Sequence, residues 1–271
     1  MRLLPAASLA THSLAELFND AYSDYLVPMR LDPDALDFTI DVTDIDLDVS
    51  RVAYEDDVPV AFAAVALRGR QAWVGGMGTR PAYRRRGLGE AALRAALEAA
   101  RDRGANEVWL EVIEGNAGAI ALYEKLGFEC IRTLVVWMLD AAAPPSGDVR
   151  RADAAVAGAW IAANRPSPEP WQRADQTLSR MRRRGLELEG LVTGGDGGIA
   201  GAAVYRVSGG RASVLQIAAR DDTAAADLLA AAGQAGGLRL INAPAGEPAS
   251  RALEALGATI DVRQAEMRLR L

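Results

Sequence analysis

Residues 79–89 read TRPAYRRRGLG and lie between an expected strand at 71–79 and an expected helix at 87–103. The first amides of a helix have no partner inside it, and the helix dipole adds positive potential at that end. A diphosphate can accept several of these amides at once. Gly87 and Gly89 let the backbone approach a bulky anion, and the arginines from Arg84 to Arg86 add positive charge. The stretch therefore predicts a phosphate-binding loop.

The spacing Arg-x-x-Gly-x-Gly is short, and by itself it fits a basic surface turn equally well. A dinucleotide-binding fingerprint follows the first strand of a βαβ unit, whereas this loop follows several strands with antiparallel turn signals. A Walker loop requires Gly-Lys-Ser/Thr, which the loop lacks. The helices and strands around the loop therefore have to distinguish a phosphate-binding loop from a basic surface turn.

The first half of the chain shows a regular alternation of helix and strand signals. Helices are expected at 14–25, 87–103 and 116–126, and strands at 50–54, 59–67, 71–79, 108–112 and 132–139. The helix at 87–103 has apolar residues at helical spacing, which are Leu88, Ala92, Leu93, Ala96, Leu97 and Ala100. Glu90 and Arg94 form a favourable i,i+4 pair on its other face.

These features together resemble the GNAT superfamily of acyl-CoA N-acyltransferases. Three motifs match in order: TRP at 79–81 leading into the loop at 84–89, WLEV at 109–112, and Asn116-x-x-Ala119-x-x-x-Tyr123 followed by EKLGF at 124–128. The clear resemblance covers residues 71–139. It implies an α/β fold with a mixed, mostly antiparallel sheet flanked by helices. The sheet would splay open between the strands at 71–79 and 108–112 and hold acetyl-CoA there.

The resemblance also implies roles for individual residues. The acetyl-CoA contacts would be Met77, Thr79, Arg84, Arg85, Arg86, Gly87, Leu88, Gly89 and Asn116. A neutral amine would attack the thioester directly, with Tyr123 as the acid that protonates the leaving thiolate. Glu111 lies where the ribosomal-protein alanine acetyltransferases place a base. The plainer alternatives are a packing role for Tyr123 and an exposed strand position for Glu111.

The second half of the chain repeats the ending of the first. The segment Ala141–Asp148 contains two prolines and a glycine, which is typical of a linker. It separates a GNAT domain at 1–140 from a second domain at 149–271. The motif ALEALG at 252–257 matches LYEKLG at 122–127 at an offset of 130, with a preceding and a following strand in register. This match favours an internal duplication over a chance similarity between two Ala- and Leu-containing helices that end in glycine.

The repeat lacks the residues that the site requires. At the same offset, Ile241 replaces Glu111 and Leu253 replaces Tyr123. The segment in the place of the phosphate loop, 219–223, contains two aspartates and no glycine, and its charge would repel a diphosphate. We therefore expect a degenerate, non-catalytic GNAT-like domain at 149–271.

Composition limits the remaining possibilities. One cysteine and one histidine exclude a metal site rich in these residues, so we expect no metal. The net charge of −6 argues against nucleic-acid binding, and no apolar stretch is long enough to span a bilayer. We expect a cytoplasmic protein without membrane or nucleic-acid partners. The sequence does not indicate its oligomeric state.

The acceptor is expected to be a small-molecule or peptide amine with positive charge. Residues 32–57 contain ten acidic residues and one basic residue, Arg51. In the family this region borders the acceptor mouth, beside Asp24 and Tyr25. A negative rim would attract a cationic amine, whereas the plain reading is a solvated acidic face. The functional alternatives are a non-catalytic acetyl-CoA-binding regulator and a transferase that uses a longer acyl-CoA.

Overall fold

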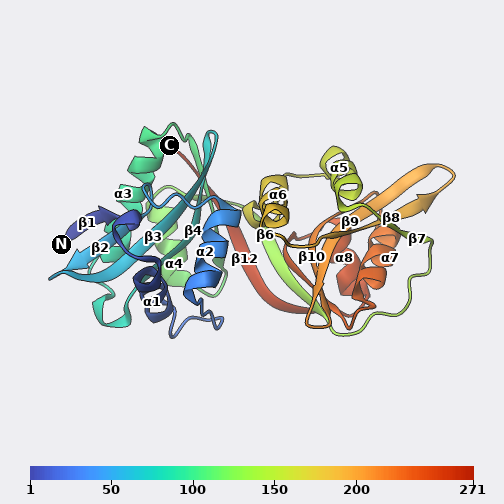
Figure 1. Ribbon diagram of the computed structural model, residues 1–271, viewed down its shortest axis with the longest axis horizontal. Coiled ribbons are helices and arrows are strands. Elements are labelled where there is room, and N and C mark those ends of the chain that lie inside the picture. The colour runs from blue at the N-terminus through green and yellow to red at the C-terminus, as the bar shows by residue number, and fades with distance from the viewer. The chain divides into compact units, whose positions relative to one another are not determined.

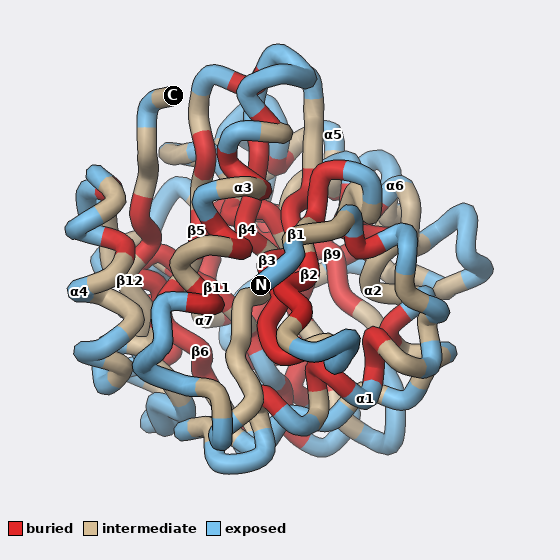
Figure 2. Tube along the Cα trace, turned by 90° about the vertical axis from the view of Figure 1, so that its left-hand side faces the viewer, coloured by how far each residue is buried: buried red, intermediate tan, exposed pale blue.

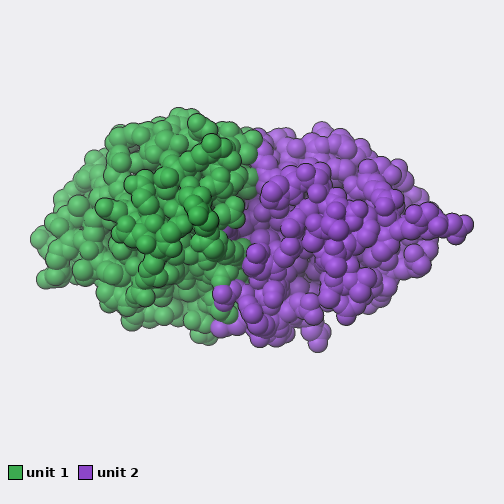
Figure 3. Space-filling model, turned by 90° about the horizontal axis from the view of Figure 1, so that it is seen from above, with its two compact units in different colours: residues 1–131, 266–271 green, residues 132–265 purple.

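The structure is a computed structural model that describes all 271 residues. It divides into two compact units, coloured separately in Figure 3. Unit 1 contains Met1–Ile131 and Glu266–Leu271, and unit 2 contains Arg132–Ala265. Each unit is a mixed, mostly antiparallel sheet flanked by helices (Figure 1), which confirms the expected fold class.

In unit 1 the strand order is β1-β2-β3-β4-β5, with the end of β12 next to β5. The strands are β1 (Arg2–Pro5), β2 (Arg51–Glu55), β3 (Val58–Arg68), β4 (Gln71–Thr79) and β5 (Glu107–Ile113). The helices are α1 (Thr11–Ala21), α2 (Pro33–Thr43), α3 (Leu88–Asp102) and α4 (Ala117–Lys125). The sequence analysis did not predict β1 or α2. All neighbouring pairs from β1 to β4 are antiparallel, and β4 pairs with β5 in parallel.

Unit 2 repeats this succession of elements. Its strands are β6 (Glu129–Leu139, from Arg132 on), β7 (Val149–Ala152), β8 (Glu189–Gly195), β9 (Gly198–Ser208), β10 (Arg211–Ala219), β11 (Leu238–Pro244) and β12 (Thr259–Arg270, up to Ala265). Its helices are α5 (Ala154–Asn164), α6 (Asp175–Arg183), α7 (Asp222–Gly233) and α8 (Pro248–Ala255). The order is β12-β6-β11-β10-β9-β8-β7, and β10 pairs with β11 in parallel, as β4 does with β5.

The unit boundaries differ from the expected division at residue 140. Strand β6 from Arg132 on belongs to unit 2, and the last six residues of the chain belong to unit 1. There the amide of Leu271 donates to the carbonyl of Asn106 (3.0 Å), and Arg268 lies over the Trp109 ring. The two final strands follow equivalent helices and share an apolar pattern, so either can complete a sheet of this kind. The sequence pattern could not show which strand completes which unit.

The segment 141–148 contains no helix or strand, as expected of a connector. It lies within unit 2, where the buried carboxylate of Asp227 in α7 accepts from the amides of Ser146 (2.8 Å) and Gly147 (3.0 Å). The connector is therefore held against its own unit.

The core of unit 1 lies on both faces of the β2–β4 sheet. Leu17 and Phe18 of α1 and Leu36 of α2 pack with Phe62 of β3 on one face. On the other side α3 buries all six apolar positions expected from its spacing. Figure 2 marks β2 and β3 as mostly buried. None of the helices combines the length and the apolar character that a membrane span requires.

Candidate active site

The parallel strands β4 and β5 pair over only three residues each. The register runs from Gln71 opposite Glu107 to Trp73 opposite Trp109 and then stops, although both strands continue. Residues 74–79 of β4 therefore form no strand pairs with residues 110–113 of β5. The predicted splay between the two strands is confirmed.

Strand β4 carries a bulge directly after the last pair with β5. Ala64 of β3 is opposite Gly76 and Val65 is opposite Val74, so Gly75 is the extra residue. A Cβ on Gly75 would lie 2.5 Å from the indole of Trp73, so only glycine lets that ring lie along the strand. The sequence analysis missed the bulge, because its only signal is the pair of glycines inside an expected strand.

The phosphate loop has the backbone that its glycines suggested. Gly87 has φ +77° and precedes α3, whose first turn has no side-chain cap. Leu88 is buried at the first helical position. A Cβ on Gly89 would lie 2.7 Å from Oγ1 of Thr79. Gly89 therefore allows the helix to approach β4, whereas Gly87 provides a left-handed backbone.

The three arginines of the loop have different environments. Arg84 donates to both carboxylate oxygens of Asp24 (2.6 and 2.7 Å) and to the carbonyls of Ala21 and Thr79. This hydrogen-bonded pairing lowers the pKa of Asp24. Arg86 is paired with Glu55 at 2.5 Å. Arg85 is exposed and makes no ion pair, so it is the arginine of the loop that can turn to a phosphate without breaking one.

Tyr123 lies in α4 and is only 6% exposed. Burial raises the pKa of its phenol, and the neighbouring Tyr22 and Tyr25 raise that pKa further. The hydroxyl is therefore protonated at neutral pH. At the start of the same helix, Oδ1 of Asn116 accepts from the amide of Ala119 (3.2 Å), which confirms the expected cap.

Glu111 lies on β5, in the part of the strand that has left β4. Its Oε2 accepts from Nε1 of Trp73 at 2.8 Å. Trp73 is the last β4 residue that pairs with β5, so this hydrogen bond fixes a carboxylate at the point where the splay begins. Trp73 was not predicted as a site residue.

Tyr22 is a further residue that the sequence analysis missed. Its hydroxyl donates to the carbonyl of Met77 in β4 (3.0 Å), and burial raises the pKa of that hydroxyl. Its ring stacks on Phe18 (4.5 Å between centroids) and meets the edge of Tyr25 (4.8 Å). The spacing i, i+4, i+7 of these three aromatic residues was the available signal, since it would place them on one face of the helix expected at 14–25. In the structure α1 ends at Ala21, and Tyr22 is its C-cap.

Much of the acidic segment has a structural role. Asp32 caps α2 by accepting from the amide of Ala35 (2.7 Å). Asp44 is paired with Arg68 at 2.8 Å, and both side chains are only 11% exposed. Asp46 accepts from two amides of its own turn. These carboxylates therefore stabilise local structure, which the charge count alone could not reveal.

In unit 2, the equivalent strands β10 and β11 also part after three pairs, at Val214 and Leu240. Here an arginine bridges the strands. Arg173 donates to the carbonyl of Leu215 in β10 (3.1 Å) and to those of Ile241 and Asn242 in β11 (3.4 and 3.3 Å). The buried carboxylate of Glu169 pairs with it at 3.0 Å.

The bulge and the helix start also differ in unit 2. The β10 bulge falls at Leu215, next to Gln216, where β4 has Gly75 and Gly76. The buried Gln216 side chain donates to the carbonyl of Arg173 (2.6 Å). Asp221 caps α7 by accepting from the amide of Ala224 (2.8 Å). The Asp221 carboxylate therefore already accepts from an amide at the start of α7 that a bound phosphate would need.

The splayed sheet, the β4 bulge and the uncapped helix after a glycine-containing loop agree with the GNAT-like arrangement expected from the sequence. Residues 11–128 match the model of the acetyltransferase (GNAT) family.

Related proteins agree with this assignment. The [ribosomal protein bS18]-alanine N-acetyltransferase of Salmonella typhimurium is 41% identical over 73 residues, which are 27% of this chain and 49% of that protein. The chain thus spans about half the length of this curated relative.

Solved structures extend the likeness to the whole fold. A GCN5-related N-acetyltransferase from Sphaerobacter thermophilus has a TM-score of 0.71 at 18% identity, covering 99% of this chain and 95% of that one. A tandem GNAT protein from the clavulanic acid biosynthesis pathway has a TM-score of 0.67 at 17% identity, covering 99% and 98%. The fold of the complete chain is therefore shared with a tandem GNAT protein.

Proposed function

We propose that the chain is an acyl-CoA-dependent N-acetyltransferase with one active site, in unit 1. The observation that carries the proposal is the splay that begins at Trp73 and Trp109. It leaves the edge of β4 unpaired between the uncapped start of α3 and the carboxylate of Glu111. A thioester with a long polar arm and a diphosphate requires such an arrangement of backbone groups and charge.

The residues around the splay fit acetyl-CoA. The uncapped first turn of α3, from Leu88 on, offers amides to the diphosphate, and Arg85 offers an unpaired guanidinium. The edge of β4 beyond Trp73 is unpaired with β5 and would bond the pantetheine amides around Met77 and Thr79, whose carbonyls also accept from Tyr22 and Arg84. Asn116 lies at the start of α4, which follows β5 in the chain. Arg84 and Arg86 would contact phosphates only by leaving Asp24 and Glu55, so we assign them a supporting role.

The reaction would be a direct transfer. The amine nitrogen attacks the thioester carbonyl, a C–N bond forms, and the C–S bond breaks. Glu111 takes the proton that the amine loses, and the Tyr123 hydroxyl gives a proton to the departing thiolate. The raised pKa of Tyr123 keeps this donor protonated until negative charge develops on sulfur. A backbone amide near the β4 bulge would stabilise the carbonyl oxygen in the transition state.

The acceptor would be a primary amine with positive charge. Asp34 and Asp37 of α2 are exposed, so they can contribute to a negative rim. Neutralising both to asparagine should lower kcat/KM for a cationic amine and weaken its dependence on ionic strength. A matched change at Asp153, an exposed carboxylate of unit 2, should have no such effect. A flat response to salt, or a preference for an anionic acceptor, would contradict a cationic acceptor.

Unit 2 would be a non-catalytic partner domain. Support comes from Arg173, which joins β10 and β11 where an acyl-CoA arm would have to lie, and from Asp221, which caps the helix that would face a diphosphate. The test of the function is release of the free CoA thiol from acetyl-CoA with a panel of amines. Binding of acetyl-CoA without thiol release for any amine would favour a regulator that senses acetyl-CoA.

A further inference from the structure

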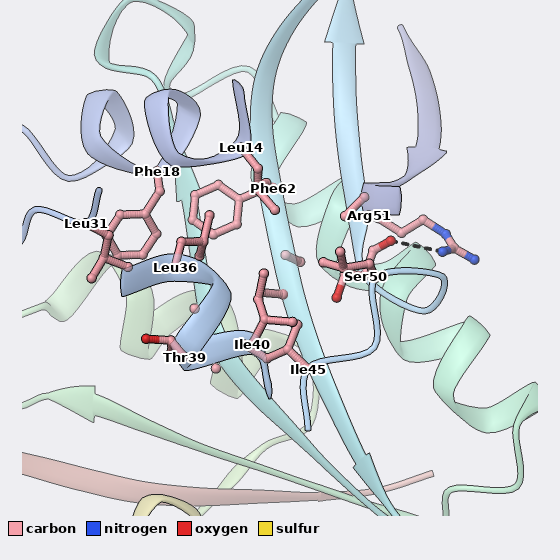
Figure 4. Close-up of a pocket in the computed structure, with 16 residues that line it drawn as sticks. Leu14, Phe18, Leu31, Leu36, Thr39, Ile40, Ile45, Ser50, Arg51 and Phe62 are labelled. Atoms are coloured by element: carbon pink, nitrogen blue, oxygen red, sulfur yellow. Dashed lines mark hydrogen bonds between the residues drawn. The ribbon is translucent and has the colours of Figure 1, made fainter. Parts of the chain in front are cut away.

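An apolar pocket of about 50 Å³ lies in unit 1 between α1, α2 and the strands β3 and β4 (Figure 4). Leu14 and Phe18 of α1 face Leu36 and Ile40 of α2 across it, and Phe62 of β3 lies beside them (Figure 4). Gly75 and Gly76 of β4 complete its wall. The mechanism proposed above does not use this pocket.

The pocket suits a hydrocarbon group. Two of its lining residues have hydroxyls, and both hydroxyls are already bonded within the protein. That of Thr39 donates to the carbonyl of Ala35 (2.8 Å). That of Ser50 donates to the carbonyl of Asp46 (2.7 Å) and accepts from the amide of Val65 (2.9 Å). Arg51 also lines the pocket, and its guanidinium donates to the carbonyls of Asp48, Val49 and Ser50. A polar ligand group would therefore lose its hydration and meet polar groups that are already bonded within the protein.

The position of the pocket connects it with the thioester. Gly75 and Gly76 form the β4 bulge, two residues beyond the last pair with β5, so the pocket begins where the splay begins. The thioester carbonyl would lie at this bulge, and its acyl chain continues from the same carbon. In unit 2 the equivalent β10 positions are Leu215 and Gln216, which carry side chains in place of the two glycines.

We propose that this pocket receives the hydrocarbon end of an acyl chain, so that the site transfers longer acyl groups as well as acetyl from acyl-CoA to the amine. The transfer is the one described above, with C–N formation and C–S cleavage, and the proposal rests on that function. A volume of about 50 Å³ holds about three to five water-sized groups, at roughly 10–15 Å³ each. The preferred acyl chain thus has about four to six carbons.

The test is kcat/KM for acetyl-, butanoyl-, hexanoyl- and decanoyl-CoA with one amine, followed by release of the CoA thiol. Each methylene that enters an apolar pocket gains a few-fold, so butanoyl-CoA should exceed acetyl-CoA by roughly tenfold. Decanoyl-CoA, which is too long for the pocket, should fall below acetyl-CoA. Dissociation constants for the same four compounds, from calorimetry, provide a readout that does not depend on turnover.

Two variants in α2 separate the pocket from general effects on the helix. Ile40→Ala enlarges the pocket and should shift the preferred chain length upward by about two carbons. Val42→Ala removes a buried side chain of the same helix that does not line the pocket, and it should leave the preference unchanged. Misfolding would lower kcat/KM for every donor, so it cannot explain a rise in kcat/KM for the longer acyl-CoA donors alone.

The outcomes distinguish this proposal from the function on which it rests. Absence of thiol release with every donor, together with no acyl-CoA binding, would reject the proposed function. Activity with acetyl-CoA that equals or exceeds the activity with both butanoyl- and hexanoyl-CoA would reject the acyl pocket alone. An unchanged chain-length order in Ile40→Ala would also reject it. If acyl-CoA binds without turnover, tighter binding of butanoyl- and hexanoyl-CoA than of acetyl-CoA would support the acyl pocket. Weaker or equal binding would reject it.

Discussion

The contact between Gly89 and Thr79 allows a sharp test of how the phosphate loop is built. In Gly89→Ala the new Cβ would lie 2.7 Å from Oγ1 of Thr79 and 3.3 Å from Cε of Met77. An ordinary contact is about 3.4 Å or more, so the start of α3 and the Thr79 side chain must move apart by about 0.7 Å. Overpacking of this size costs about 1–3 kcal/mol, offset by the roughly 1 kcal/mol that alanine gains over glycine in a helix.

The movement should weaken acetyl-CoA binding more than it weakens folding. Hydrogen bonds to charged groups contribute about 1.5–3 kcal/mol each, so displacing the amides of this turn should raise the Kd at least tenfold. Thr79→Ala removes the clashing oxygen and should restore most of the affinity in the double variant. Calorimetry of the two single variants and the double variant gives the coupling energy, which we expect to be at least about 1 kcal/mol.

Gly87→Ala is the matched control for this cycle. No atom lies within 4 Å of a Cβ at Gly87, but its φ of +77° strains any other residue, at about 1–2 kcal/mol. Thr79→Ala should therefore not rescue it. Additive effects of Gly89→Ala and Thr79→Ala, or an unchanged Kd in Gly89→Ala, would refute the packing explanation.

Four further changes test the other parts of the site in unit 1 and the buried ion pair of unit 2. Tyr123→Phe should lower kcat by about 10²–10⁴-fold with little change in the Kd for acetyl-CoA; unchanged turnover, with chemistry shown to limit the rate, would remove Tyr123 as the acid. Glu111→Gln should abolish the acid limb of the pH–rate profile, and Trp73→Phe should shift that limb because it removes the hydrogen bond that positions the carboxylate; profiles identical to wild type would point to another base. Burial raises the pKa of Glu169 to about 6 from 4.5, so its contribution to stability is present below pH 4.5 and is lost as the pH rises through 6. The difference in free energy of unfolding between wild type and Glu169→Gln should therefore fall by about 2 kcal/mol from pH 4.5 to 7, and a constant difference in chemical denaturation would contradict this.

Local patterns predicted the parts of the site that local physics determines. The spacing of apolar residues gave the buried face of α3, and Asn116 was recognised as the cap of α4. The glycines at 87 and 89 indicated an unusual backbone, although the reason for Gly89 is its approach to Thr79. Each of these features depends on residues a few positions apart in the chain.

The missed features depend on residues that are distant in sequence. Arg84 was assigned to phosphate from its position in the loop, but its partner Asp24 is 60 residues away. The hydrogen bond from Tyr22 to Met77 spans 55 residues. In unit 2, Arg173 reaches the carbonyl of Leu215 across 42 residues. Sequence spacing does not report such contacts, because they form only when the sheet brings the segments together.

The exchange of final strands is a further limit of the sequence pattern. Strands β6 and β12 have similar alternation and follow equivalent helices, so their sequences fit either sheet. The last six residues, Glu266–Leu271, complete unit 1 only in the folded chain. Removal of these residues should therefore destabilise the unit that contains the phosphate loop.

The number of acetyl-CoA molecules bound per chain tests the central claim most directly. Titration of the full-length protein by isothermal calorimetry should give one site, because unit 1 has an unpaired β4 edge and an uncapped α3, whereas Arg173 and Asp221 occupy the equivalent positions in unit 2. Gly89→Ala should weaken acetyl-CoA binding at this single site, and Asp221→Asn should leave it unchanged. Two sites per chain, or a site that persists unchanged in Gly89→Ala, would contradict the account.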